Sequence, residues 1–91
     1  MKKQKGYKYV FQVKTEYTSD FNEMKQQRSD LFHASKDLKR RGINASYNDG
    51  FLTIATNTMK EMDKAFSYLV SIQIYSSKKD ALSDMKWQGN Y

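Results

Sequence analysis

The segment DFNEMKQQRSDLFHASKDLKRR, residues 20 to 41, determines the fold that we expect for this chain. On a helix, its apolar and small side chains recur at steps of three and four residues and form one face: Phe21, Met24, Leu31, Ala34, Ser35 and Leu38. Cationic side chains form a stripe along one flank of this face: Lys25, Arg28, Lys36, Lys39 and Arg40. Acidic side chains lie on another side: Glu23, Asp30 and Asp37. Solvated helices usually intersperse the two signs, so this separation of charge is unusual.

Both ends of this helix have recognisable signals. Thr18, Ser19 or Asp20 can cap its N-terminus, and Glu23 is well placed in the first turn. The basic run that ends at Arg41 meets the negative end of the helix, and Gly42 supplies the left-handed exit. We therefore predict a helix from about residue 20 to residue 41.

A β-hairpin is predicted directly after this helix. Asp49-Gly50 is a strong two-residue hairpin turn, and it lies between segments 43–48 and 51–56. The turn pairs Tyr47 with Leu52, Ala45 with Ile54 and Ile43 with Thr56 on a mainly apolar face. The other face receives three further pairs: Asn48 with Phe51, Ser46 with Thr53, and Asn44 with Ala55. A slip of one residue would mix the two faces, so the turn and the pattern support each other.

The segment before the first helix predicts another strand. Tyr7, Tyr9, Phe11 and Val13 alternate with more polar residues over residues 7–15, and they should face the core. The opposite face of the sheet would then be open and would display eight side chains: Lys8, Val10, Gln12, Lys14, Asn44, Ser46, Phe51 and Thr53.

The last third of the chain predicts two more helices. Thr58 and Glu61 have the spacing of a capping box, and the buried face follows as Met59, Met62, Phe66, Leu69 and Val70. Residues 70–75 could finish this helix or form a fourth strand; we favour helix to about Tyr75, because no turn residue interrupts it. Ser77 then resembles a new cap, and Ala81, Leu82 and Met85 predict a short amphipathic helix with Trp87 beside it.

The expected fold is therefore α+β, in the order β-α-β-β-α-α, with a three-stranded, mostly antiparallel sheet and helices packed on one face. The 91 residues suffice for a single small domain. Residues 1–5 are expected to form a basic flexible arm, and residues 88–91 a tail.

Composition restricts the functions that we expect. The chain has no cysteine, so a disulfide framework, a thiol nucleophile and a cysteine zinc site are excluded. No apolar run approaches the length of a signal sequence or a membrane span, so we expect a soluble protein in the cytoplasm of a bacterial or infected cell. The net charge of +6 favours polyanionic partners. The Lys-rich, Tyr-rich and Pro-free composition is typical of AT-rich coding, as in phages and mobile elements.

We expect no enzymatic activity, cofactor or metal. The only histidine, His33, has Asp30 and Asp37 at helical steps, yet an exposed histidine with solvated neighbours is much the commoner arrangement. A second histidine and clustered carboxylates for a metal are lacking. The four glycines are scattered singly, so no phosphate-binding loop is predicted.

Binding of nucleic acid, RNA in preference to duplex DNA, is the function that the sequence favours. Helix-turn-helix and zinc-finger patterns are absent, and an open sheet with basic flanks suits single strands. The order of residues 7 to 70 partly resembles an RNA-recognition motif, with Gly50-Phe51 at the position of a glycine–aromatic pair; Leu52 and Thr53 depart from that signature. The predicted contact residues are Lys2, Lys3, Lys5, Lys8, Lys14, Lys25, Arg28, Lys36, Lys39, Arg40, Arg41 and Phe51.

A different class of function remains open. A phage or mobile element could encode such a protein as an inhibitor that docks on an acidic host protein, such as a defence nuclease or toxin, with or without RNA. We also predict a symmetric homodimer, because the C-terminal third has more apolar residues than one helix face can bury. Its interface would comprise Ile74, Tyr75, Leu82, Met85 and Trp87. The alternative is that the last helix folds back over this surface within one chain.

Overall fold

The computed structural model describes residues 6–16 and 18–88. Three strands and three helices follow one another as predicted: β1 (Tyr9–Lys14), α1 (Phe21–Arg40), β2 (Asn44–Asn48), β3 (Phe51–Thr56), α2 (Met59–Ser71) and α3 (Lys78–Gln88). The strands form one antiparallel sheet in the order β1-β3-β2. The predicted α+β class and element order are confirmed. The basic arm at residues 1–5 and most of the predicted tail lie outside the described residues.

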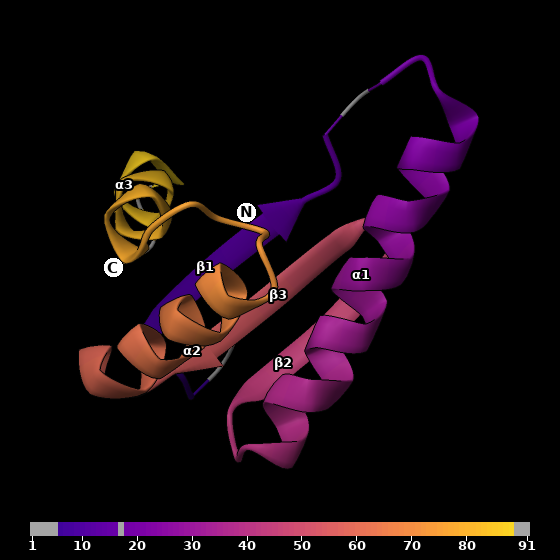
Figure 1. The fold of residues 1–91 in the computed structure, drawn as a ribbon. Helices are drawn as coiled ribbons and strands as arrows, with labels where there is room; N and C mark the ends of the chain where they lie inside the picture. Colours follow the sequence, from indigo (N-terminus) through magenta and orange to yellow (C-terminus); the bar gives the residue numbers. More distant parts are fainter. Residues whose placement is uncertain (1–5, 17, 89–91) are drawn as a thin grey trace.

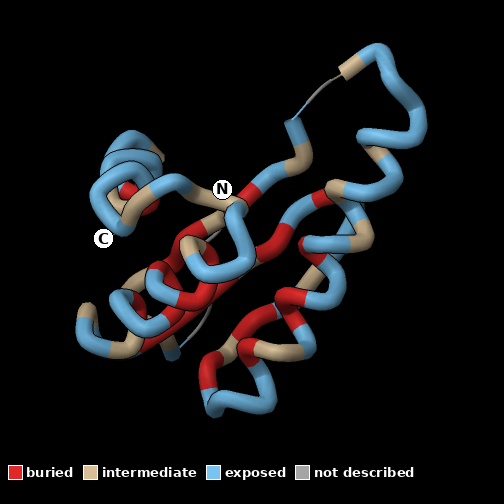
Figure 2. The backbone as a smooth tube through the Cα atoms, in the orientation of Figure 1, coloured by how far each residue is buried: buried red, intermediate tan, exposed pale blue. Residues whose placement is uncertain are grey.

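The helices enclose the core against the sheet (Figure 1). Helix α1 packs on β2 and β3, α2 packs on β3, and α3 lies beside β1. The sheet contributes Phe11, Val13, Ala45, Leu52 and Ile54 to the core, all buried. Figure 2 shows that burial is concentrated along the strands and the inward sides of α1 and α2. The predicted alternation of buried and exposed side chains along the strands therefore decides which face of the sheet packs against the helices.

The hairpin has the predicted register, with Tyr47 opposite Leu52 and Ala45 opposite Ile54. Asp49 and Gly50 both have positive φ, 52° and 86°, as the turn requires. The Gly50 carbonyl accepts hydrogen bonds from the Thr15 backbone N–H at 3.0 Å and from its hydroxyl at 2.9 Å. These two bonds fix the end of β1 to the hairpin turn.

Helix α1 begins and ends close to the predicted residues. The Asp20 carboxylate caps it by accepting from the N–H groups of Asn22 and Glu23. At its other end Gly42 has φ +81°, and the N–H groups of Gly42 and Ile43 donate to the carbonyls of Lys39 and Leu38. This is the Schellman arrangement, in which glycine takes the left-handed position.

Helix α2 is shorter than predicted. It ends at Ser71, and Gln73 takes a left-handed conformation with φ 65°. The N–H groups of Gln73 and Ile74 donate to the carbonyls of Val70 and Leu69, which is the same Schellman pattern without a glycine. The expected continuation to Tyr75 is therefore wrong, and no fourth strand forms in the described residues either. The chain turns back at Gln73, which packs Ile74 and Tyr75 against the core.

The two edge strands of the sheet, β1 and β2, differ in whether another segment covers their backbone. On β1, the Gln88 side chain of α3 accepts from the Gln12 N–H at 2.9 Å and donates to the Gln12 carbonyl at 2.6 Å. This side-chain amide takes the place of a neighbouring strand. Strand β2 has no such partner among residues 6–16 and 18–88. The edge beside α1 is thus the open one.

Candidate nucleic-acid interface

The cationic stripe of α1 lies on the side of the helix that faces the β2 edge. Lys25, Arg28, Lys36 and Lys39 are all exposed. None of these four forms an ion pair with another described residue. From Lys25 to Lys39 they extend over roughly 21 Å of helix, at about 1.5 Å per residue. They form a row of charges on a rigid support.

Two phenylalanine rings lie within this row. Phe32 is 41% exposed and Phe21 is 77% exposed. The Phe32 ring meets Tyr47 of β2 edge to face at 5.9 Å, and the Lys36 Nζ lies 4.8 Å from the centroid of the Phe32 ring. We call the set of Phe21, Lys25, Arg28, Phe32, Lys36 and Lys39 the basic-aromatic flank.

The expectation that Phe21 belongs to the buried face of α1 is wrong. The first turns of α1 extend past the end of the sheet (Figure 1), so no strand lies beneath Phe21. Burial in α1 begins only at Leu31. Phe32 was not among the predicted site residues, although its position four residues from both Arg28 and Lys36 places it in the cationic stripe.

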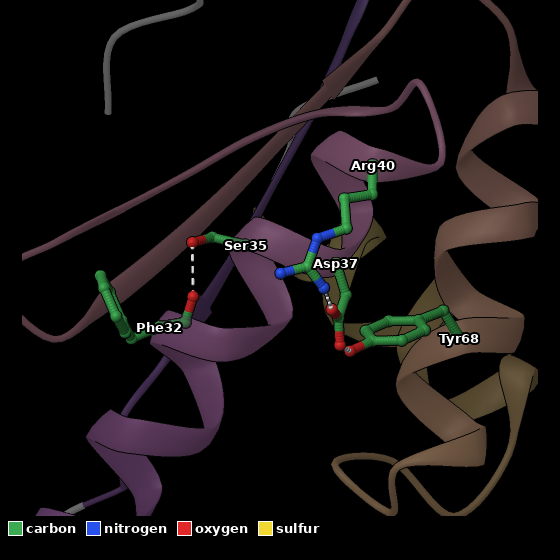
Figure 3. Close-up of polar contacts among 5 residues, drawn as sticks. All are labelled: Phe32, Ser35, Asp37, Arg40 and Tyr68. Atoms are coloured by element: carbon green, nitrogen blue, oxygen red, sulfur yellow. Dashed lines mark hydrogen bonds and ion pairs between the residues drawn. The ribbon is translucent and has the colours of Figure 1, made fainter.

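Arg40 and Arg41 do not extend the flank: Arg40 pairs with Asp37 of its own helix, and Arg41 contacts helix α2. Arg40 forms an ion pair with Asp37 at 2.7 Å, and the Tyr68 hydroxyl of α2 donates to Asp37 at 2.7 Å. The Arg41 guanidinium carbon lies 4.8 Å from the centroid of the Tyr68 ring. Figure 3 shows Asp37 directed towards Tyr68, with Phe32 on the other side of α1. Burial, with the hydrogen bond to Asp37, raises the pKa of Tyr68 to about 12.

The open face of the sheet presents a smaller cationic surface. Phe51 is 39% exposed and pairs across the sheet with Lys14 and Asn48. Lys8 is exposed, with its Nζ 5.6 Å from the centroid of the Tyr9 ring.

Part of the sheet face that was predicted to be open is buried. Val10, expected on the exposed surface, is buried together with its partner Ala55. Tyr7 precedes β1 and lines a shallow hollow with Asn44 and Ala55. The accessible part of the open face therefore lies towards Phe51 and Lys14. The other predicted cations, Lys2, Lys3 and Lys5, lie outside the described residues.

The residues of the predicted dimer interface do not form one exposed surface. Met85 is fully buried, and Ile74, Tyr75 and Leu82 pack partly against the core, so α3 folds back within the chain. Trp87 alone of these five is fully accessible, at 90% exposure. It lines an open groove of about 910 Å³ together with Ile72, which is also exposed.

This groove differs from the basic-aromatic flank in its charge. Of the described residues, three acidic side chains line it, Glu16, Asp30 and Asp84, and one cationic side chain, Lys14. Asp84 accepts a hydrogen bond from the Tyr75 hydroxyl at 2.6 Å, and burial with this bond raises the pKa of Tyr75. The structure thus has a cationic surface on one side of α1 and an acidic, partly apolar groove on the other.

Among residues 6–16 and 18–88, no hydrogen bond or ion pair joins His33 to an acidic side chain. Its ring meets Phe32 edge to face at 5.6 Å. Asp30 accepts a hydrogen bond from Gln26 at 2.9 Å, while Asp37 is engaged by Arg40 and Tyr68.

In residues 6–16 and 18–88, no three histidine or acidic side chains lie close enough together to hold a metal ion. Within the same residues, none of the helices combines the length and apolar character of a membrane span. Comparison with protein-family models, curated proteins and solved structures finds no match to this chain.

Proposed function

We propose that this protein binds nucleic acid, RNA in preference to duplex DNA, through the basic-aromatic flank of α1. The observation that supports this most is the row of four exposed cations without acidic partners among the described residues. Phosphate groups are the ligands for such a row, because each neutralised phosphate releases condensed counterions and so adds to affinity.

The distribution of acidic side chains favours the same ligand. Asp30 and Asp37 lie on the other flank of α1, where Asp37 bonds to Tyr68 and Asp30 lines the groove. The potential at the basic-aromatic flank is therefore not cancelled by carboxylates of the same helix. With a net charge of +6, the field of the chain as a whole also attracts polyanions.

The preference for RNA rests on the surface beyond the flank. Phe32 contacts Tyr47, the next residue Asn48 pairs with Phe51, and Phe51 pairs with Lys14. Exposed aromatic side chains, Phe32 and Phe51, therefore lie at the two ends of a path around the open β2 edge, with the half-buried Tyr47 and the exposed Asn48 between them. A flexible strand can follow this bent path, whereas a duplex is too stiff.

A titration followed by NMR tests the assignment of the surface. Addition of a single-stranded RNA 10-mer to the labelled protein should shift the backbone amides of residues 25–39 and of β2. A DNA duplex of ten base pairs serves as the control and should give smaller shifts. Shifts confined to the open sheet face, or to the acidic groove, would contradict binding through α1.

Docking on a host protein is the second candidate function. The exposure of Trp87 and Ile72 beside the groove favours it, because exposed tryptophan commonly anchors protein interfaces. An inhibitor encoded by a phage or mobile element would use such an anchor. Pull-down from host lysate with the unaltered chain and with Trp87→Ser tests it: a partner lost only with the variant supports docking, and the same proteins recovered with both contradict it.

A further inference from the structure

We infer that Phe32, with Phe21 as a second platform, stacks on unpaired bases, so that the basic-aromatic flank selects single strands over paired nucleic acid. This inference rests on the proposed function and names the ligand class for that surface. A duplex hides its base faces in the stack, and only unpaired bases can lie flat on an aromatic side chain.

The distribution of phenylalanines supports a binding role for these rings. The chain has five phenylalanines. Phe11 and Phe66 meet edge to face at 5.5 Å inside the core, while Phe21, Phe32 and Phe51 are exposed. An exposed ring forgoes the free energy of burial. Two of the three lie in the single cationic row of α1, next to side chains that bind phosphate.

The surroundings of Phe32 suit a stacking platform. Its contact with Tyr47 ties the ring to β2, and Ser35, one turn further on, is buried. The Lys36 ammonium above the ring shows that a cation can reach this face. A base can displace that ammonium, because a base stack is stronger than an exposed cation–ring contact, and Lys36 can then pair with a phosphate.

The position of Phe21 extends the platform along the helix. It lies eleven residues before Phe32, which places the two rings on the same side of α1 and roughly 16 Å apart. Lys25 and Arg28 lie between them in the row. If two bases stack on the rings of Phe21 and Phe32, the phosphates between those bases would therefore lie next to Lys25 and Arg28.

Fluorescence anisotropy with three labelled probes tests the inference. The probes are a single-stranded uridine 10-mer, an abasic ribose-phosphate 10-mer and an RNA duplex of ten base pairs. The unaltered protein should bind the uridine strand about fivefold or more tightly than the abasic strand, the lower end of the effect of one base–aromatic stack. Phe32→Leu should lose most of this difference while affinity for the abasic strand stays unchanged.

Control variants separate stacking from other effects. Trp87→Leu, in the acidic groove, should keep the preference for the uridine strand. Phe21→Leu should reduce it by a smaller factor than Phe32→Leu; because Phe21 is outside the core, this variant tests stacking even where Phe32→Leu fails to fold.

Failure of the inference is distinguishable from failure of the proposed function. Equal binding of the uridine and abasic strands by the unaltered protein overturns stacking but leaves phosphate binding in place. A preference that is lost with Trp87→Leu and kept with Phe32→Leu overturns the assignment to α1. Absence of binding to all three probes overturns the proposed function and the inference together.

Discussion

The ends of α1 and α2 allow one residue exchange to be tested in both directions. Both helices end in the same hydrogen-bond pattern, with Gly42 in the left-handed position after α1 and Gln73 in that position after α2. Gln73→Gly should therefore stabilise the protein, and Gly42→Gln should destabilise it. A Cβ at residue 42 would have no heavy atom within 4 Å, so steric overlap does not complicate the comparison.

The magnitude follows from two opposing terms. A left-handed conformation costs a residue with a side chain about 1–2 kcal/mol, which glycine avoids. Glycine in turn loses about 0.5–1 kcal/mol more conformational entropy on folding. The net change in the free energy of unfolding is roughly 0.5–1 kcal/mol in either direction. At the 4–8 °C per kcal/mol typical of small domains, the melting temperature should move by about 2–8 °C.

Urea unfolding followed by circular dichroism measures both changes. The unaltered chain, each single variant and the double exchange are compared at equal protein concentration. The double exchange should return close to the unaltered midpoint, because the two positions share no contact. A Gln73→Gly variant that is less stable than the unaltered chain would refute the left-handed end of α2, and would favour a helix that continues to Tyr75.

Three further predictions address the turn, the α1–α2 contact and the association state. Gly50→Val should lower stability by about 1–3 kcal/mol, since a β-branched residue resists positive φ; an unchanged melting temperature would place the turn elsewhere. Absorbance of tyrosinate should show Tyr68 ionising near pH 12, above ordinary tyrosines. Folding favours the neutral form of Tyr68, so the stability that Tyr68 contributes is complete below about pH 10 and is lost as pH rises through about 12. Tyr68→Phe should remove both the ionisation near pH 12 and this loss of stability. If the predicted dimer forms, Trp87→Ser should return the mass in light scattering to 10.7 kDa, and that mass for the unaltered chain would refute the dimer.

The hairpin and α1 could be predicted because several local signals agreed there. Asp49-Gly50 permits only a few turn conformations, and the apolar pattern on both sides requires the same register. Asp20 and Gly42 likewise mark the two ends of an amphipathic segment. Where turn chemistry, capping and periodicity agree, the tertiary structure has little reason to override them.

The end of α2 could not be predicted because Gln73 gives no local signal. A left-handed residue after a helix is usually glycine, and glutamine is a good helix former. The conformation is imposed by packing, since turning at Gln73 brings Ile74 and Tyr75 to the core. The tertiary gain thus exceeds a local cost that the sequence pattern does not reveal.

The candidate site was only partly predictable for a related reason. Periodicity identified the four exposed cations of the flank, but it could not show that Arg41 lies on the ring of Tyr68, a residue of a distant segment, or that Arg40 pairs with Asp37, which Tyr68 also binds. It also assigned Phe21 to the core, because a helical pattern does not reveal where the sheet beneath the helix ends. These outcomes depend on contacts between segments far apart in the sequence.

The salt dependence of RNA binding tests the proposed function most directly. For single strands, the slope of log affinity against log salt is about −0.7 for each phosphate neutralised, so four cations contribute about −3. The test variant replaces by glutamine the four cations of the flank: Lys25, Arg28, Lys36 and Lys39. A control variant with the same net charge replaces four exposed lysines of α2 and α3: Lys60, Lys64, Lys79 and Lys86. We predict a slope shallower by about 3 in the test variant and nearly unchanged in the control. Equal changes in the two variants, or a flat salt response of the unaltered protein, would contradict RNA binding through α1.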